Sequence, residues 1–311
     1  MASLWTQVSQ SLTVFLLIVL GYALAAFTPW AREAGKPLST FVFNVSLPAL
    51  LFTITSKPAH TTPSWKVVGA YFGGCFAVFV VGRLVAQPFT ELDGAGKSLL
   101  AVGGIFSNNV LLGIPLTQAF LGPAALPAVA MVLIFNAAVL WTLATASIEY
   151  ARGGALTARS LVRTAVGVTV TPLVLAILVG TCLRLFDLRT PSVIADPAEL
   201  LGQSGTPLAL VVLGIGLQRY GVRNGWKVSV LITAVKLVVH PLVVWLLAIA
   251  LGLSTIETLA VVLMASIATG ANVYLMAEKF EVLQGPVASA IVLSTTLSVV
   301  TTPLWLALVR Q

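Results

Sequence analysis

Apolar stretches as long as a membrane helix recur along this chain, and they constrain its fold more than any other feature. Ten can be marked, at roughly 8–27, 37–56, 66–87, 98–120, 124–148, 162–183, 199–218, 228–251, 257–277 and 287–308. A helix needs about 20 apolar residues to cross a bilayer. Only 9% of the residues are charged, against about 25% in soluble domains. The sequence therefore predicts an all-α integral membrane protein with ten transmembrane helices and no soluble domain.

Two of these stretches are interrupted at matching places. The fourth is broken within residues 107–115 (SNNVLLGIP) and the ninth within residues 268–272 (ATGAN). A break inside a membrane helix is tolerated only where it is buried in protein or lines a wet cavity. Breaks at corresponding places in two halves of a sequence indicate a transporter binding site. We therefore predict that substrate contacts come from Asn108, Asn109 and Asn272, with Gly113, Pro115 and Gly270 as hinge residues.

Short matches at a nearly constant offset indicate that the two halves repeat each other. The pairs are WKV at 65–67 and 226–228, Pro48 and Pro207, Gly-Pro at 122–123 and 285–286, and Asn109 and Asn272. Five spans per repeat is an odd number, so the second repeat must be inverted, and broken helices 4 and 9 can then cross near the midplane. We expect a first repeat at 1–151, a cytoplasmic connecting loop at 152–163 and a second repeat at 164–311.

Lysine and arginine fall unequally on the two sides that ten spans imply. One side holds Arg32, Lys36, Arg83, Lys97, Arg152, Arg159, Arg163, Arg219, Arg223, Lys227 and Lys279, and the other holds Lys57, Lys66, Arg184, Arg189 and Arg310. The richer side is predicted to be cytoplasmic. Both termini then face outward from a plasma membrane, the inner membrane of a bacterium. We attribute the net charge of +7 to this excess of lysine and arginine on the cytoplasmic side, and we expect no nucleic-acid partner.

The interrupted helices suggest a chemistry. A half-helix N-terminus presents unpaired N–H groups and a positive dipole end, which favour anions. Two such ends could hold a carboxylate without a formal positive charge, with the asparagines as further donors and acceptors. The alternative interpretation is that the asparagines only cap the broken helix ends.

Lys236 lies well inside the eighth stretch, with His240 one turn further on. A lysine at the bilayer centre costs about 2.5 to 3.5 kcal/mol on insertion scales, which indicates a role by default. It could attract the anion, bind a substrate carboxylate or titrate. Alternatively, it pairs with backbone carbonyls at a helix break or snorkels to the interface. His240 is more typical of a satisfied core polar group than of a proton carrier.

The motifs resemble one transporter family. Residues 104–116 (GIFSNNVLLGIPL) resemble the fourth-span signature of the auxin efflux carrier family, and residues 272–277 (NVYLMA) resemble its ninth-span signature. The fifth span, from Asn136 to Glu149-Tyr150, is similar to that of the plant carriers. The family commonly has proline just before the second crossover, where this chain has Ala268-Thr269-Gly270.

This resemblance implies a scaffold domain, a transport domain and a substrate held where helices 4 and 9 cross. It also implies an elevator-type motion, a homodimer, and organic anions such as auxin, malate or malonate as substrates. Carried over by position, it adds Asn136 and Ser46 to the predicted binding residues. We expect neither a cofactor nor a metal.

The resulting prediction is a secondary transporter of small organic acids. An anion channel and a sodium-coupled transporter of the same fold are the alternatives. An intramembrane enzyme is disfavoured, because no metal motif, Gly-x-Ser-x-Gly elbow or acid pair occurs in the spans. No carboxylate lies at mid-span, so a cation as principal substrate is disfavoured too. Uniport is the simplest coupling, while substrate identity and transport direction stay open.

Overall fold

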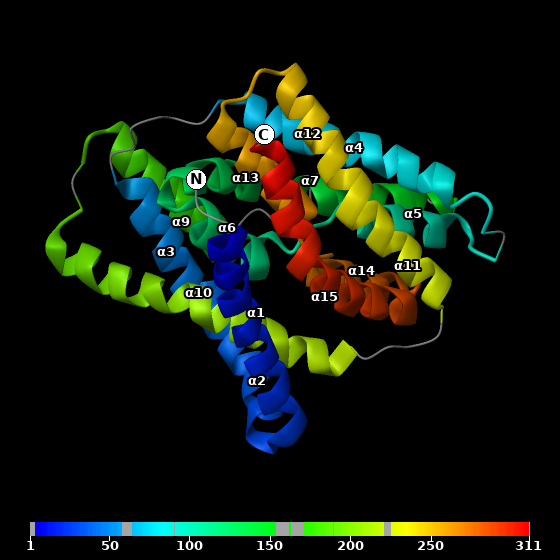
Figure 1. The fold of residues 1–311 in the computed structure, drawn as a ribbon, viewed down its shortest axis with the longest axis horizontal. Coiled ribbons are helices and arrows are strands. Elements are labelled where there is room, and N and C mark those ends of the chain that lie inside the picture. Colours follow the sequence, from blue (N-terminus) through cyan, green and yellow to red (C-terminus); the bar gives the residue numbers. More distant parts are fainter. Residues whose placement is uncertain are drawn as a thin grey trace. The chain divides into compact units, whose positions relative to one another are not determined.

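Long apolar helices dominate the structure. The computed structural model describes residues 4–57, 64–89, 91–153, 162, 171–188, 190–220 and 225–310, and these residues form helices and connecting turns without a named strand (Figure 1). The all-α class predicted from the sequence is thereby confirmed. An unbroken helix satisfies its own backbone groups, which suits segments of this composition to a membrane interior.

Six helical segments of the described chain are long and apolar enough to cross a membrane. They are Pro29–Ser56, Lys66–Val85, Pro123–Ala151, Ser192–Gln218, Trp226–Ala250 and Gln284–Val309. Four shorter apolar helices lie at Phe15–Phe27, Asn109–Leu121, Pro172–Leu185 and Thr255–Ser266. The integral membrane class is therefore confirmed, and the count of ten crossings and their inverted repeat stay predictions. Two of the shorter helices belong to the interrupted stretches, because the interruptions divide them.

The chain divides into two compact units made of interleaved segments. The first unit comprises Met1–Ser64, Val110–Ile134 and Val170–Arg219, and the second comprises Trp65–Asn109, Phe135–Thr169 and Tyr220–Gln311. The helix α7 (Leu126–Ala151) contributes to both units. Of the predicted cytoplasmic connection at 152–163, all but residues 152, 153 and 162 lie outside the described residues.

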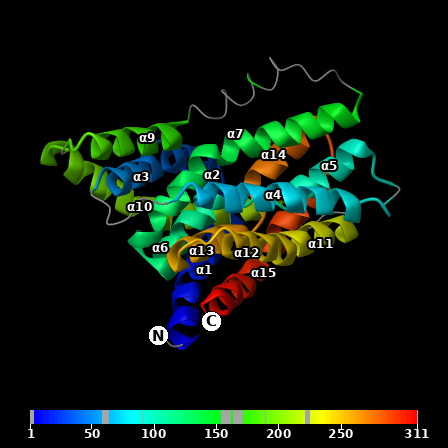
Figure 2. The same cartoon turned by 90° about the horizontal axis from the view of Figure 1, so that it is seen from above.

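The first unit is built from two long helices, α1 and α10, and several shorter ones. These are α1 (Leu4–Phe27), α2 (Pro29–Phe41), α3 (Leu47–Ser56), α6 (Ile114–Leu121), the single turn η3 (Pro123–Ala125), α9 (Pro172–Leu185) and α10 (Ser192–Tyr220). The helices α3 and α9 lie side by side (Figure 2). Helices α1 and α10 approach so closely that a Cβ at Gly21 would overlap the carbonyl of Val211. Glycine is therefore required at this helix contact.

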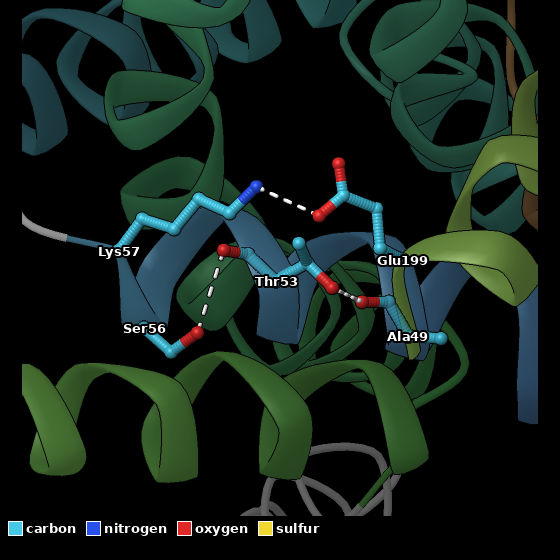
Figure 3. A network of polar contacts seen from close by, with 5 residues as sticks. All are labelled: Ala49, Thr53, Ser56, Lys57 and Glu199. Carbon is cyan, nitrogen blue, oxygen red and sulfur yellow. Dashed lines mark hydrogen bonds and ion pairs between the residues drawn. The ribbon is translucent and has the colours of Figure 1, made fainter. Parts of the chain in front are cut away.

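An ion pair at the end of α3 also belongs to the first unit. The Lys57 ammonium lies 3.0 Å from a carboxylate oxygen of Glu199 on α10 (Figure 3). Beside it, the Thr53 hydroxyl donates to the carbonyl of Ala49 within α3. Both charged side chains are about half exposed, at 58% and 49%. Exposed pairs of this kind contribute about 0 to 1 kcal/mol, so burial in the helix contacts contributes more to the fold.

The second unit holds the interruption of the ninth stretch and the part of the fourth-stretch interruption that ends at Asn109. Its helices are α4 (Lys66–Val85), α5 (Gly94–Gly103), α11 (Trp226–Ala234), α12 (His240–Ala250), α13 (Thr255–Ser266), α14 (Ala271–Phe280) and α15 (Gln284–Val309). The helix α12 packs along α4 and also contacts α13 (Figure 2). Polar caps fix where two of the short helices begin: Asp93 accepts from the Gly96 amide at α5, and Ser254 and Glu257 form a capping box at α13.

Prolines explain three short π-helical segments. These are η1 (Val42–Ser46), η2 (Asn109–Gly113) and η4 (Val235–Val239), and each ends two residues before a proline, namely Pro48, Pro115 and Pro241. Proline lacks an N–H, and its ring clashes with the carbonyl four residues earlier. The turn widens instead, so the amides of Leu47 and His240 donate to carbonyls five residues earlier. Such π-bulges recur at functional sites.

Candidate functional site

The two interrupted segments hydrogen-bond to each other in the second unit. Ser107 and Thr269 face each other in an isolated antiparallel bridge. The Asn108 amide donates to the carbonyl of Ala268 at 2.9 Å, and the Gly270 amide donates to the carbonyl of Phe106 at 2.7 Å. Each break therefore satisfies backbone groups that the other has released, which an interrupted helix needs inside a membrane.

Gly270 allows the two backbones to approach this closely. A Cβ at this position would lie 2.9 Å from the Ser107 carbonyl oxygen and 3.3 Å from Cδ1 of Phe106. The backbone of Gly270 is extended, with φ of −73° and ψ of 146°, a conformation that any residue can adopt. The requirement for glycine is thus steric, and it comes from the partner segment.

Side-chain hydroxyl groups also form hydrogen bonds at the break in the ninth stretch. The Thr269 amide donates to Oγ of Ser294 on α15 at 3.0 Å, and the Thr269 hydroxyl donates to the carbonyl of Gly103 at 3.1 Å. The Thr302 hydroxyl donates to the carbonyl of Ser266 at 3.1 Å. Sequence reasoning did not identify these residues. The signal that could have found them is a row of serines and threonines inside the last apolar stretch, where an unpaired hydroxyl would be costly.

Three of the predicted asparagines come together beside the bridge. Asn109 donates from Nδ2 to the hydroxyl of Tyr71 at 2.9 Å and to Oδ1 of Asn136 at 3.1 Å. Asn108, Asn109 and Asn136 are all buried, with 7%, 2% and 6% of their surface exposed. We call these three residues the amide cluster. Its members come from α7 and from the interrupted stretch between α5 and α6, which are distant in sequence.

Two polar atoms of the amide cluster have no hydrogen-bond partner among the described residues. They are Nδ2 of Asn108 and Oδ1 of Asn109. A buried polar group without a partner costs about 1 to 3 kcal/mol, and such groups in native proteins call for an explanation. One donor and one acceptor are thus held in place with nothing from the described chain to bind them.

Tyr71 is a member of this network that sequence reasoning missed. It is fully buried, its hydroxyl accepts from Asn109, and it donates to Oγ of Ser107 at 3.4 Å. A buried tyrosine usually needs a partner for its hydroxyl, which was the available signal. The sequence alone did not say which of the many other polar groups that partner would be.

Asn272 lies beside the bridge without capping the helix that follows it. The helix α14 begins at Ala271, and its N-cap is Gly270, which makes no side-chain cap bond. Asn272 is the second residue of the helix and is partly buried. The positive end of this helix dipole is therefore not covered by a capping side chain. The alternative that Asn272 only caps its helix does not describe this geometry.

The other predicted residues do not belong to the amide cluster. Gly113, Pro115 and Ser46 are part of the first unit. Gly113 ends η2 and accepts from the Thr117 hydroxyl, and Pro115 is the second residue of α6, which begins at Ile114. Ser46 ends η1, is fully buried, and shares a 3.0 Å hydrogen bond with Oγ of Ser204 on α10.

Lys236 lies in η4 and is fully buried. Its ammonium donates to the carbonyl of Ala265 near the C-terminal end of α13, and Nζ lies 3.2 Å from Nδ1 of His240. The helix dipole favours a cation at that end. The expectation of contact with a backbone carbonyl at a helix break fits this geometry, and both named contacts are internal to the protein.

Comparisons with known proteins find similarity along nearly the whole chain. A model of the family described as "Membrane transport protein" matches residues 6–306. A Rhizobium meliloti (strain 1021) protein named "Putative malonate transporter" is 28% identical over 311 residues, covering 96% of this chain and 95% of that protein. An "Uncharacterized transporter" of Methanothermobacter thermautotrophicus is 25% identical over 297 residues, covering 94% and 95%.

Proposed function

Because the chain belongs to the membrane transport protein family, that of the auxin efflux carriers, we propose that it is a secondary transporter of small organic anions. The substrates are carboxylates such as malonate-, malate- or auxin-like acids. A relative that aligns along nearly its whole length is named for malonate, which supports a carboxylate of this size. The protein is a transporter and not an enzyme.

One observation carries the assignment of the site. The amide cluster holds a buried donor, Nδ2 of Asn108, and a buried acceptor, Oδ1 of Asn109, with no partner among the described residues. The uncapped N-terminus of α14 begins directly after the bridge. A carboxylate would accept from the side-chain amide of Asn108 and from the first backbone amides of α14. Asn272 and Asn136 would complete the polar wall, Lys236 would act without touching the substrate, and a contact with Ser46 stays a prediction.

The proposed mechanism is an elevator-type alternating access, in which the unit that holds the paired breaks carries the substrate across the membrane. In this proposal the chain is an inverted repeat of 1–151 and 164–311, joined by the cytoplasmic segment 152–163. Gly113, Pro115 and Gly270 are its hinge positions, where the helices are already widened or extended. The functional protein is a homodimer in the plasma membrane, the inner membrane in a bacterium, with both termini outside.

A sodium-coupled transporter is a second candidate, and one observation favours it. The unpartnered Oδ1 of Asn109 is an acceptor, and an amide oxygen can bind a hard cation as well as a donor group. Sodium would then bind together with the anion. An anion channel with the same site is distinguished by its kinetics, because channel flux does not saturate and shows no counterflow.

The first test is ligand binding by thermal shift, followed by uptake into proteoliposomes. Mono- and dicarboxylates, aromatic acids and sodium are the probes. A ligand that binds only the folded state stabilises it by RT ln(1 + [L]/Kd), so weak substrates register at millimolar concentration. A carboxylate hit with saturable flux and counterflow supports the proposal. A response to neutral or cationic solutes alone, with none to any acid, refutes the anion assignment.

Asn108→Ala tests the site. Its Nδ2 has no partner among the described residues, so removing it should leave the melting temperature near that of the wild type while weakening substrate affinity about tenfold or more, as expected for a hydrogen bond to a charged group. Asn44→Ala is the matched control, because Asn44 is exposed and bonds only to its own helix at the Thr40 carbonyl. Normal affinity in a folded Asn108→Ala protein would rule out the proposed site.

A further inference from the structure

A buried lysine with no acidic partner among the described residues lies in the same unit as the amide cluster. Lys236 is residue 11 of the 25-residue apolar segment Trp226–Ala250, close to its middle, and none of its side chain is exposed. Its hydrogen-bond partners are the Ala265 carbonyl and Nδ1 of His240. Nδ1 accepts from the lysine when Nε2 of His240 carries the proton and faces Sγ of Cys75, which is 3.4 Å away.

Among the described residues, the groups that contact Lys236 and His240 are dipoles, and none of them is a carboxylate. His240 comes from its own segment, Cys75 and Tyr71 come from α4, and the Ala265 carbonyl comes from α13. All the acidic residues of the second unit lie at or beyond helix ends. They are Glu91, Asp93, Glu149, Glu257, Glu278 and Glu281. Within the membrane-spanning part of this unit, the sequence offers no anion to balance the lysine.

Lys236 is connected to the proposed anion site on two routes. On the first route, Ala265, which accepts from Lys236, lies three residues before Ala268. The carbonyl of Ala268 accepts from the backbone amide of Asn108. On the other route, the ring of His240 contacts the ring of Tyr71 at a centroid distance of 5.8 Å, and the Tyr71 hydroxyl holds Asn109 at 2.9 Å. The lysine and the amide cluster therefore belong to one packed body.

A transported anion would supply the missing negative charge. Building on the transport function proposed above, we propose that Lys236 is the fixed positive charge that accompanies a bound monoanion across the membrane. The loaded unit then crosses with this pair of charges balanced. The empty unit returns with one uncompensated positive charge. Lys236 is thus a positioning and charge-balancing residue, and it need not touch the substrate.

Measurements of exchange and of net flux separate the crossing of the loaded unit from the return of the empty unit. Exchange of labelled for unlabelled substrate uses only the loaded unit, so its rate should not respond to membrane potential. Net flux also requires return of the empty unit, so its rate should respond. One charge moved through 100 mV shifts an equilibrium about 50-fold, and a rate whose barrier lies halfway changes about sevenfold. The difference between the modes is therefore large enough to measure.

The experiment uses the full chain in proteoliposomes, with potassium gradients and valinomycin setting 0 or 100 mV of either sign. The probe is a radiolabelled monocarboxylate that the thermal-shift screen has identified. In the wild type, exchange should change less than about 1.5-fold and net flux severalfold. Lys236→Met should make exchange voltage-dependent, by about sevenfold at 100 mV. Lys236→Arg, which keeps the charge, and Lys57→Met, which removes an exposed lysine of the first unit, should leave exchange insensitive.

Two outcomes would overturn the inference: voltage-dependent exchange in the wild type, or voltage-insensitive exchange in a folded Lys236→Met protein. If Lys236→Met does not fold, the wild-type measurement still decides, because voltage-dependent exchange there is incompatible with a balanced loaded unit. Failure of the proposed function looks different. In that case the wild type shows no saturable exchange of any acid at any potential.

Discussion

Replacing Gly270 by alanine tests whether the close approach of the two interrupted segments holds the site together. The added Cβ would lie 2.9 Å from the Ser107 carbonyl oxygen, 3.2 Å from its carbonyl carbon and 3.3 Å from Cδ1 of Phe106. Two of these three atoms are backbone atoms. They cannot move away without disturbing the two backbone hydrogen bonds on either side of the bridge, which are 2.7 and 2.9 Å long.

The expected cost follows from these contacts. Overpacking of a tight core typically costs about 1 to 3 kcal/mol, and each weakened backbone hydrogen bond costs about 0.5 to 1.5 kcal/mol more. The backbone of Gly270 suits any residue, so no conformational strain is added. We expect Gly270→Ala to lose about 2 to 3 kcal/mol of stability. Its melting temperature should fall by about 5 °C or more, on the scaling for large domains.

The assay is thermal unfolding of purified protein in detergent, followed by substrate titration. Gly216→Ala is the matched control, because a Cβ at Gly216 would meet nothing within 4 Å and alanine favours a helix by about 1 kcal/mol over glycine. Gly270→Ala should melt lower and bind substrate more weakly than this control. If its melting temperature and affinity equal those of the wild type, the steric reasoning about the paired breaks is refuted.

Three further substitutions test the surroundings of the breaks. Ser294→Ala should cost about 1 to 3 kcal/mol in thermal unfolding, because it leaves the Thr269 amide unpaired; an unchanged melting temperature would contradict this. Tyr71→Phe removes the hydroxyl that holds Asn109, so titration should show severalfold weaker substrate binding, and equal affinity would exclude a positioning role. Arg152→Met removes the 2.5 Å bond to the last carbonyl of α14 and should lower stability by about 1 kcal/mol, and calorimetry finding no loss would make this bond unimportant.

Much of the class of this protein could be predicted from local pattern. Stretches of about 20 apolar residues predict membrane helices because lipid leaves the backbone no other partner. The sequence also indicated where the ninth stretch is interrupted. The structure leaves residues 267–270 outside any helix and begins the next helix at Ala271. A break is visible in sequence because glycine and asparagine there depart from the apolar pattern.

The partners of the site residues could not be predicted in the same way. Asn109 was singled out by its place in a motif, but its bonds to Tyr71 and Asn136 join residues 38 and 27 positions apart. Ser46 was assigned to the site, and the structure pairs it with Ser204 in the first unit. Hydrogen bonds between spans depend on which helix faces come together, and composition does not encode that.

The sequence by itself determined that the helices of this protein lie in a membrane and where those helices are interrupted, since both follow from the chemistry of single residues and short runs. Only the tertiary structure decided what those breaks do. It paired two segments about 160 residues apart, at Ser107 and Thr269, and left an amide donor and an amide acceptor unpartnered beside them. It also seated Lys236 at the end of α13, by a contact across 29 residues of chain. Inside a membrane the polar groups freed at a break must find partners within the protein, and packing determines which ones they reach.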